Sequence, residues 1–200
     1  MDFKIFSVCT GNVCRSPIAE LILAEELSSY PTVTVESAGI GALVGSGVPE
    51  PGRRLAGVYD LDASLHVARQ LDTEMIRSSS LILGMAREHR RRVVELAPGA
   101  MRRTFTLREL ARIADAVEDR LPQAVEVARG QGPTAALKSA VALAAAMRGT
   151  VPPPEDADDF DVVDPYRQSD DVYRQSFEEL VPAARRVSEF LSRAVTIASV

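Results

Sequence analysis

A short segment near the start of the chain combines cysteine, glycine, asparagine and arginine. It reads Val8-Cys-Thr-Gly-Asn-Val-Cys-Arg-Ser-Pro17. Successive backbone N–H groups in such a turn can curve around an anion, because Gly11 and Asn12 tolerate the left-handed backbone that the curve requires. Arg15 adds a planar guanidinium suited to bidentate contact with phosphate oxygens. The segment therefore predicts a site for a tetrahedral oxyanion.

Cys9 lies at the base of this predicted cradle, where its sulfur could attack the bound group. A positive field that binds phosphate also favours the thiolate form of a cysteine. The hydroxyl of Ser16 could donate to the sulfur, both as nucleophile and as leaving group. The backbone N–H groups and Arg15 would stabilise charge on the equatorial phosphoryl oxygens. These residue types predict phosphoryl transfer through a covalent phospho-cysteine.

Three other interpretations of the segment are weaker. A zinc site would need two more ligands, and besides carboxylates the chain offers only His66 and His89. The G-x4-G-K-[ST] pattern of a nucleotide-binding loop is absent. A buried structural role for Cys9 is possible in principle, but its neighbours argue against it. We therefore expect neither a metal nor a cofactor.

A proton donor for the leaving oxygen is found late in the chain. Asp164 precedes Pro165 and Tyr166 and follows an apolar pair of valines. The proline fixes the backbone beside the carboxyl group, which could then be held over the anion site. Asp164 would protonate the ester oxygen and afterwards, as a carboxylate, activate water against the phospho-cysteine. Taken alone, this tripeptide is an ordinary turn.

The loop resembles the signature of the low-molecular-weight protein tyrosine phosphatases, C-x-G-N-x-C-R-S-P, without a mismatch, and Asp164 begins a match to the family's D-P-Y motif. The resemblance covers most of residues 1–110 and again about 160–195. It implies a protein-tyrosine-phosphatase with catalytic Cys9, Arg15 and Asp164. Its substrate would be a phosphorylated protein carrying phosphotyrosine, or a small phosphomonoester, with phosphate as product. The residues that would contact substrate are Thr10, Gly11, Asn12, Val13, Cys14, Ser16, Leu43 and Tyr166.

Two further residues match a supporting network of the family. His66 opens a segment that resembles the family's H-x-A-R-Q motif, in which the histidine helps to brace the loop asparagine. The resemblance implies that His66 supports Asn12 here. Ser37 resembles a serine of the same network. Both are expected to support the site without contacting substrate. His89 lies among the arginines of segment 87–92 and is expected to be exposed on a solvated helix face.

Three positions depart from the family's pattern. The loop 39–52 lacks an aromatic wall residue, and Leu43 is the nearest equivalent. Arg167 follows Tyr166 where many relatives have a second aromatic, and Ala86 stands where an acidic residue is usual. Flanking aromatics grip a phosphotyrosine ring, so strict specificity for phosphotyrosine stays open. Arg167 could favour an acidic or more polar substrate.

Two other functions fit the same loop. Arsenate reductases share the fold that the resemblance implies. The class that relays oxidation to two further downstream cysteines is excluded because no cysteine follows Cys14, but a version that uses an external thiol stays open. The other alternative is a regulatory module that binds anions without turnover. The joint presence of Cys9, Arg15, Ser16 and Asp164 argues against it.

Charge and cysteine content indicate the setting. The net charge of −5 argues against a broad nucleic-acid surface. No apolar stretch approaches the length of a membrane span, and the chain starts without a basic leader, so we expect no export signal. Two cysteines are too few for a disulfide framework, and a reducing cytoplasm is the expected location. The family resemblance implies that Cys9 and Cys14 can pair reversibly under oxidation.

The elements that must position these residues alternate along the chain. Apolar segments predict strands, and amphipathic segments between them predict helices. Ser16 and Pro17 predict the start of the first helix. The alternation indicates a three-layer α/β/α fold with a central four-stranded parallel sheet and the loop at the carboxyl edge of the first strand. The predicted strands are 3–8, 32–36, 80–84 and 103–107.

A helical insertion of about residues 112–158 is expected before the C-terminal helix, within one domain that spans 1–200. Helical segments are predicted near 112–129 and 134–147. A proline run then stops the second helix, and the acidic stretch after it is expected to be a solvated linker. The final helix, 171–197, could bend or break at Pro182. The insertion could be a lid, a surface that binds a partner, or a decoration without a function of its own, and the last is the default expectation.

Overall fold

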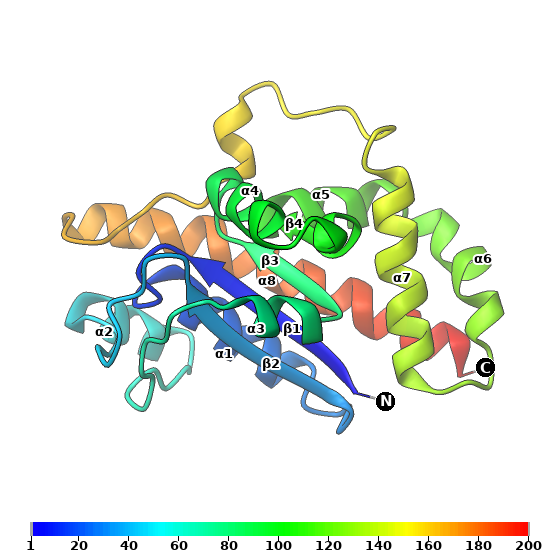
Figure 1. Ribbon diagram of the computed structural model, residues 1–200, viewed down its shortest axis with the longest axis horizontal. Helices are drawn as coiled ribbons and strands as arrows, with labels where there is room; N and C mark the ends of the chain where they lie inside the picture. Colours follow the sequence, from blue (N-terminus) through cyan, green and yellow to red (C-terminus); the bar gives the residue numbers. More distant parts are fainter. Residues whose placement is uncertain (1, 200) are drawn as a thin grey trace.

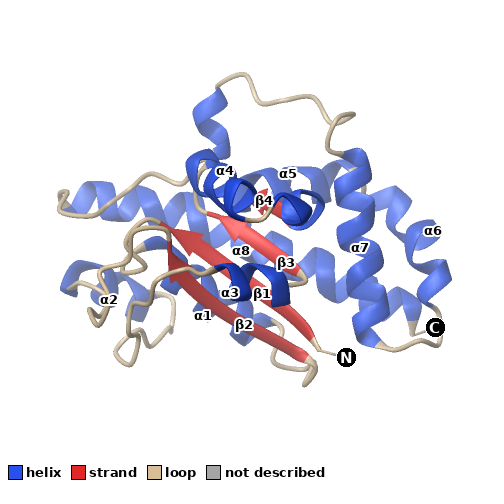
Figure 2. Cartoon of the chain, viewed as in Figure 1, coloured by secondary structure: helices blue, strands red, loops and turns tan. Residues whose placement is uncertain are grey.

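A four-stranded parallel sheet lies at the centre of the computed structural model, which describes residues 2–199. The strand order is β2-β1-β3-β4, and all three neighbouring pairs run parallel (Figure 2). All four predicted strands are present, and the predicted fold class is confirmed. The strands are β1 (Phe3–Cys9), β2 (Val33–Gly39), β3 (Leu81–Gly84) and β4 (Thr104–Thr106).

Helices cover both faces of the sheet (Figure 1). The period of two along β1 sends Phe3 and Ile5 into one core, and Phe6 and Val8 into the other. The first core is closed by α1 (Arg15–Glu26), α5 (Leu107–Ala116) and α8 (Asp170–Ala198). The second is closed by α3 (Thr73–Ser78) and α4 (Arg87–Leu96), while α2 (Glu50–Val58) packs beside α8.

The first helix begins slightly earlier than predicted. It starts at Arg15, and its N-cap position is Cys14, which makes no side-chain capping bond. Ser16, the predicted N-cap, is instead inside the first turn. Its hydroxyl lies 3.0 Å from the sulfur of Cys9, so the side chain is directed at the loop and not at the helix backbone.

The last helix runs without a break from Asp170 to Ala198. Pro182 is exposed, while its neighbours Val181 and Ala183 are buried. Packing on both sides of the proline holds the helix together although one backbone hydrogen bond is lost. Within residues 2–199, no helix combines the length and the apolar character needed to cross a bilayer.

The insertion is helical but more divided than predicted. The segment predicted as one helix from 112 to 129 is split, because α5 ends at Ala116 and α6 (Leu121–Val125) begins just before Pro122. A proline fits the first turn of a helix but not its interior, so a new helix starts there. The next helix, α7 (Pro133–Met147), agrees with the prediction. Both α6 and α7 pack on the C-terminal half of α8 (Figure 1).

The acidic stretch after the prolines is exposed, as expected for the predicted solvated linker, but it is also folded and bound to the body of the protein. Ala157–Phe160 forms a short 3₁₀ helix. Asp158 pairs with Arg87, and Asp159 pairs with Arg108. Arginines at the start of α4 and α5 attract this stretch and fold it onto the body of the protein. The arginine cluster 87–92 is accordingly not wholly a solvated face.

Candidate active site

The loop between β1 and α1 follows the curved path expected from its sequence. Asn12 has a φ of 55°, whereas Gly11 is not among the residues with positive φ. The prediction of left-handed backbone therefore holds at Asn12 alone. The loop also passes very close to β2, because a Cβ atom on Gly39 would lie 2.4 Å from the carbonyl oxygen of Thr10. Glycine at position 39 makes this close approach possible.

The sulfur of Cys9 is buried at the base of the loop. The side chain is 2% exposed, and Sγ accepts a hydrogen bond from the backbone N–H of Asn12 at 3.2 Å. The hydroxyl of Ser16 lies 3.0 Å from the same sulfur. An amide and a hydroxyl directed at one sulfur atom are the donors that an anionic thiolate needs.

Arg15 and Asp164 meet beside this loop although they are far apart in the sequence. Nη2 of Arg15 lies 2.8 Å from Oδ2 of Asp164, and Nη1 donates to the carbonyl oxygen of Val162 at 3.1 Å. Arg15 is almost fully buried, while half of the Asp164 side chain is exposed. The other carboxylate oxygen, Oδ1, accepts from the backbone N–H of Tyr166 at 3.2 Å. The carboxylate is therefore held by contacts on both oxygens.

These three groups border one pocket of about 120 Å³. Nine of the eleven residues predicted to be catalytic or to contact substrate line this pocket. One of the nine, Leu43, supplies an apolar wall. Asn12 and Ser16 were predicted to contact substrate, but neither lines the pocket, because both side chains are fully buried behind the loop. Gly41 was not predicted. The lining residues are Cys9, Thr10, Gly11, Val13, Cys14, Arg15, Gly41, Leu43, Asp164 and Tyr166.

The sequence profile described as low molecular weight phosphotyrosine protein phosphatase matches residues 4–126. The match covers more than half of the chain. The chain belongs to this phosphatase family. The predicted family is therefore confirmed, and the C-x-G-N-x-C-R-S-P loop lies inside the matched region.

Three similar proteins illustrate the range of the family. The low molecular weight protein-tyrosine-phosphatase Wzb of Salmonella typhi is 43% identical over 95 residues, which are 48% of this chain and 62% of that protein. A protein-arginine-phosphatase of Geobacillus stearothermophilus is 37% identical over 109 residues, 54% of this chain and 72% of that protein. The structure of Vibrio vulnificus Wzb in complex with benzylphosphonate has a TM-score of 0.62 and 25% identity, covering 94% of this chain and 99% of that one.

Behind the loop of this family member, the side chain of Asn12 is fixed by three hydrogen bonds. Its Nδ2 donates to Ser37 Oγ at 2.8 Å and to Ser16 Oγ at 3.0 Å, and its Oδ1 accepts from the backbone N–H of Arg69 at 2.9 Å. Ser37 in turn donates to Glu20 at 2.5 Å. These three hydrogen bonds direct the carboxamide to the interior, which fixes the curvature of the loop.

His66 supports the same asparagine through the backbone. Its Nε2 lies 2.6 Å from the carbonyl oxygen of Asn12. The sequence indicated that His66 and Ser37 lie behind the site, but it did not indicate the roles of Arg69 and Glu20. Arg69 donates to the carbonyl oxygen of Ser37 and pairs with Glu36. Its position inside the H-x-A-R-Q segment was the available signal.

His89 is buried, contrary to our prediction that it is exposed. Its side chain is fully buried, and Nε2 lies 3.0 Å from Oγ1 of Thr10 in the loop. Burial, and secondarily the charge of Arg15, lower the pKa of His89 to about 3. The imidazole is therefore neutral at physiological pH. The signal missed in the sequence was the spacing of His89 and Val93, which place two buried side chains on one face of α4.

Cys14, the second cysteine of the loop, is buried among Val13, Ala68 and Tyr173. Its sulfur lies 3.7 Å from the hydroxyl of Tyr173 in α8. Burial raises the pKa of Cys14 to about 11. Both cysteines are free, and their reversible pairing under oxidation stays a prediction.

A larger cleft of about 810 Å³ adjoins the pocket. Arg15 and Asp164 line both spaces, so the carboxylate stands between them. The far wall of the cleft comes from the first turns of α4 and from residues that close the insertion, including Asp158 and Asp161. In the part of the chain that the structure describes, no three His, Cys, Asp or Glu side chains are grouped so that they could hold a metal ion.

Proposed function

We propose that this chain is a protein-tyrosine-phosphatase that hydrolyses phosphate monoesters through a phospho-cysteine on Cys9. One observation carries the proposal: the sulfur of Cys9, the guanidinium of Arg15 and the carboxylate of Asp164 border the same small pocket. A nucleophile, a cationic clamp and a proton donor are the groups that this reaction needs. Membership of the phosphatase family supports the proposal.

In the first step, the Cys9 thiolate attacks phosphorus in line with the ester oxygen. The S–P bond forms while the P–O bond breaks, and Asp164 transfers its proton to the departing oxygen. Arg15, which pairs with Asp164 in this structure, turns its donors to the equatorial phosphoryl oxygens. The exchange frees the carboxyl group for the leaving group and stabilises charge on the phosphoryl group.

In the second step, water attacks the phosphorus atom of the phospho-cysteine. Asp164, now a carboxylate, accepts a proton from this water, the S–P bond breaks, and phosphate leaves. The hydroxyl of Ser16, 3.0 Å from the sulfur, stabilises the departing thiolate. The half-exposed position of Asp164, next to the large cleft, gives water a path to the carboxylate.

The walls of the pocket favour an aromatic ester. Val13 and Leu43 contribute aliphatic surface, and Tyr166 contributes a ring. A phenyl ring can stack on Tyr166 and pack against Leu43, although a leucine gives less contact than an aromatic wall would. The complex of the Vibrio vulnificus relative with benzylphosphonate supports an aryl group at this place. We therefore propose phosphotyrosine in a protein as the substrate, with small aryl phosphates as substitutes.

Phosphoarginine is the second candidate substrate, because one relative is a protein-arginine-phosphatase. A phosphoguanidinium group carries positive charge and would need a carboxylate close to its nitrogens. Among the residues described, Asp164 is the one carboxylate that lines the pocket, and it pairs with Arg15. A single carboxylate, which must also serve as the proton donor, and the apolar walls from Val13 and Leu43 favour phosphotyrosine. The named relatives are phosphatases, so neither arsenate reduction nor anion binding without turnover is favoured.

Hydrolysis of a phosphotyrosine peptide and of a phosphoarginine peptide by the same preparation tests both substrates. We expect a kcat/KM at least about tenfold higher for phosphotyrosine, corresponding to about 1.4 kcal/mol. Cys9→Ser should abolish both activities. Rapid acid quench of the wild type during turnover should trap a phosphate on the peptide that contains Cys9. Turnover without any phospho-cysteine would contradict the proposed mechanism.

A further inference from the structure

Several successive residues of the segment that leads from the insertion to Asp164 are hydrogen-bonded to the rest of the protein. It leaves the 3₁₀ helix Ala157–Phe160 and reaches the pocket at Asp164. Figure 1 shows this stretch returning from the extended loop after α7 to the neighbourhood of α4. Its contacts determine where the carboxylate of Asp164 can lie.

Asp161 is bound to the first residue of α4. Its Oδ1 accepts from the backbone N–H of Arg87 at 2.7 Å, and its two oxygens accept from Nε of the same arginine at 3.2 and 3.0 Å. The N-cap residue of α4 is Ala86, which has no side chain that could cap the helix. Asp161, from a distant part of the chain, therefore caps the N-terminus of α4. The positive end of the helix dipole stabilises its negative charge.

A second arginine reinforces this attachment. Nη1 of Arg108, in the first turn of α5, donates to the carbonyl oxygen of Asp161 at 2.8 Å. Its Nη2 donates to Asp159 at 3.2 Å. Arg87 also reaches Asp158, with 2.6 Å between Nη2 and Oδ1. The starts of two helices thus bind both the side chain and the backbone of this stretch.

The two residues between Asp161 and Asp164 are fixed by their backbones. Val162 N–H donates to the carbonyl oxygen of Met85 at 2.8 Å, and Val163 N–H donates to Glu179 at 2.8 Å. Val162 also accepts from Arg15. Three successive residues are therefore held at three different places: the start of α4, the residue that follows β3, and α8. A carboxylate directly after such a stretch has little freedom to move.

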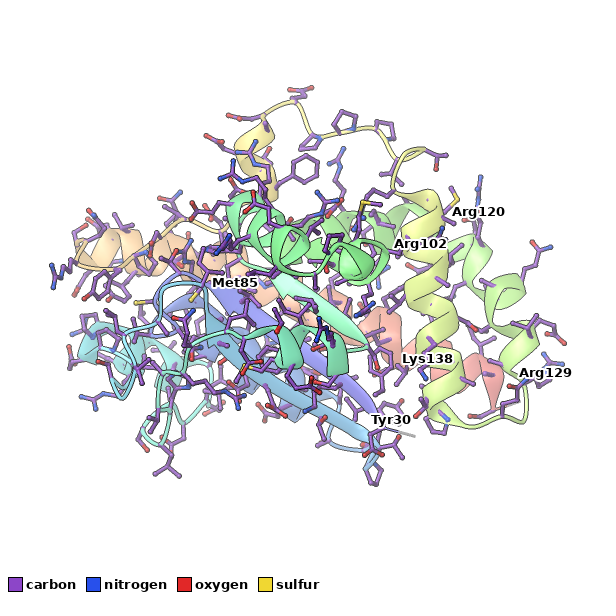
Figure 3. The ribbon with its side chains drawn as sticks, in the orientation of Figure 1. Tyr30, Met85, Arg102, Arg120, Arg129 and Lys138 are labelled. Carbon is purple, nitrogen blue, oxygen red and sulfur yellow. The ribbon has the colours of Figure 1, made fainter. Side chains whose placement is uncertain are left out.

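The body of the insertion, α6 and α7, lies away from the pocket. Figure 3 shows Met85, next to the return segment, well separated from Arg120 and Arg129, which lie around α6 at the other end of the view. Asp158 and Asp161 line the cleft beside the pocket, and no described residue of α6 or α7 lines either space.

We propose that Asp161 and Arg87 are positioning residues that hold Asp164 over the pocket, so that the insertion is coupled to catalysis through its return segment. This inference rests on the proposed function, in which Asp164 protonates the leaving oxygen. The ion pairs around Arg87 are partly exposed, and such pairs contribute little to global stability. Their effect is on geometry, because a displacement of about 1 Å in a catalytic group can cost roughly 10²-fold in rate.

Leaving-group dependence tests this role, because protonation matters most for poor leaving groups. We compare kcat/KM for phenyl phosphate, which has a poor leaving group, and for 4-nitrophenyl phosphate, which has a good one. Asp161→Ala and Arg87→Gln should each lower kcat/KM for phenyl phosphate about tenfold, below the roughly 10²–10⁴-fold expected for removal of the general acid itself. The nitrophenyl ester should lose less than about threefold in the same variants.

Two controls separate positioning from a structural defect. Arg92→Gln removes an exposed arginine of α4 that pairs with Glu95, and it should leave both substrates unchanged. Asp161→Asn keeps an oxygen that can accept from the N–H of Arg87, so it should recover part of the activity. A loss of equal size for both esters in Asp161→Ala would overturn the inference.

A second measurement distinguishes this inference from the proposed function. In an Asp164→Asn background, Asp161→Ala should have no further effect on phenyl phosphate hydrolysis, because residues that act through one group are not additive. Additive losses would overturn the inference while leaving the phosphatase proposal intact. Absence of hydrolysis in the wild type, or a wild-type rate in Asp164→Asn, would instead overturn the proposed function.

Discussion

Nε2 of His89 lies 3.0 Å from Oγ1 of Thr10, so a fully buried imidazole on α4 contacts the anion loop. Gly84 allows this contact, because a Cβ atom there would lie 2.9 Å from the backbone nitrogen of Arg90 and 3.2 Å from Cβ of His89. The helix therefore packs directly on the end of β3. A neutral histidine in this position supports the loop without adding a charge beside Arg15.

The depressed pKa of His89 predicts a specific pH dependence of stability. Burial lowers this pKa from 6.5 to about 3, so between these values the unfolded chain binds a proton that the folded chain excludes. The contribution is constant above pH 6.5, and the free energy of unfolding falls by up to about 1.4 kcal/mol per pH unit as the pH drops toward 3. His89→Gln should remove this part of the slope.

Urea unfolding of the wild type and of His89→Gln at pH 7, 6 and 5 measures this difference. We expect the wild type to lose stability faster than the variant as the pH falls. Parallel curves for the two proteins would show that His89 titrates normally in the folded state.

Asp164→Ala should lower kcat by about 10²–10⁴-fold for a poor leaving group, as for removal of a general acid. The alkaline limb of the pH profile of kcat/KM should also change, since the variant lacks the group that must be protonated in the first step. Steady-state kinetics with phenyl phosphate across the pH range measures both effects. A profile with wild-type shape and rate would assign the proton transfer to another residue.

Cys14 should react slowly with alkylating reagents in the folded protein. With a pKa raised to about 11 by burial, only about one molecule in ten thousand carries the thiolate at pH 7. In a Cys9→Ser background, iodoacetamide labelling of Cys14 followed by mass spectrometry should rise about tenfold per pH unit up to pH 11. Labelling at pH 7 as fast as in the urea-unfolded protein would contradict this environment.

Ser37→Ala should weaken the brace behind the loop. The variant removes one acceptor of the fully buried Asn12 amide, and a buried donor left without a partner costs about 1–3 kcal/mol. We expect this loss in urea unfolding and a parallel decrease in kcat/KM. Ser78→Ala, which removes an exposed hydroxyl bonded to Met75, serves as the matched control and should change neither quantity.

The parts of the structure that depend on local sequence could be predicted. The strands are short apolar runs, so their positions followed from composition. β2 extends to Gly39, beyond its predicted end, because its pairing with β1 continues to Cys9. The anion loop was predictable for the same reason, because its glycine, asparagine and arginine all lie within residues 11–15.

The parts that depend on pairing between distant segments could not be predicted. The bond between Asp161 and Arg87 joins the end of the insertion to α4, and no local pattern indicates it. His89 was assigned to the surface because its neighbours are arginines, yet the direction of one side chain on α4 decides its burial. The break before α6 follows from Pro122, which the Ala/Val-rich composition of the segment concealed.

The 29-residue helix α8 runs from the anion loop to the helices of the insertion. Near its start, Tyr173 contacts Cys14, and its C-terminal half packs against α6 and α7. At 1.5 Å per residue the helix is roughly 44 Å long, and it is continuous over this length. Deleting α8 would therefore remove both the Tyr173 contact with the anion loop and the surface on which α6 and α7 pack.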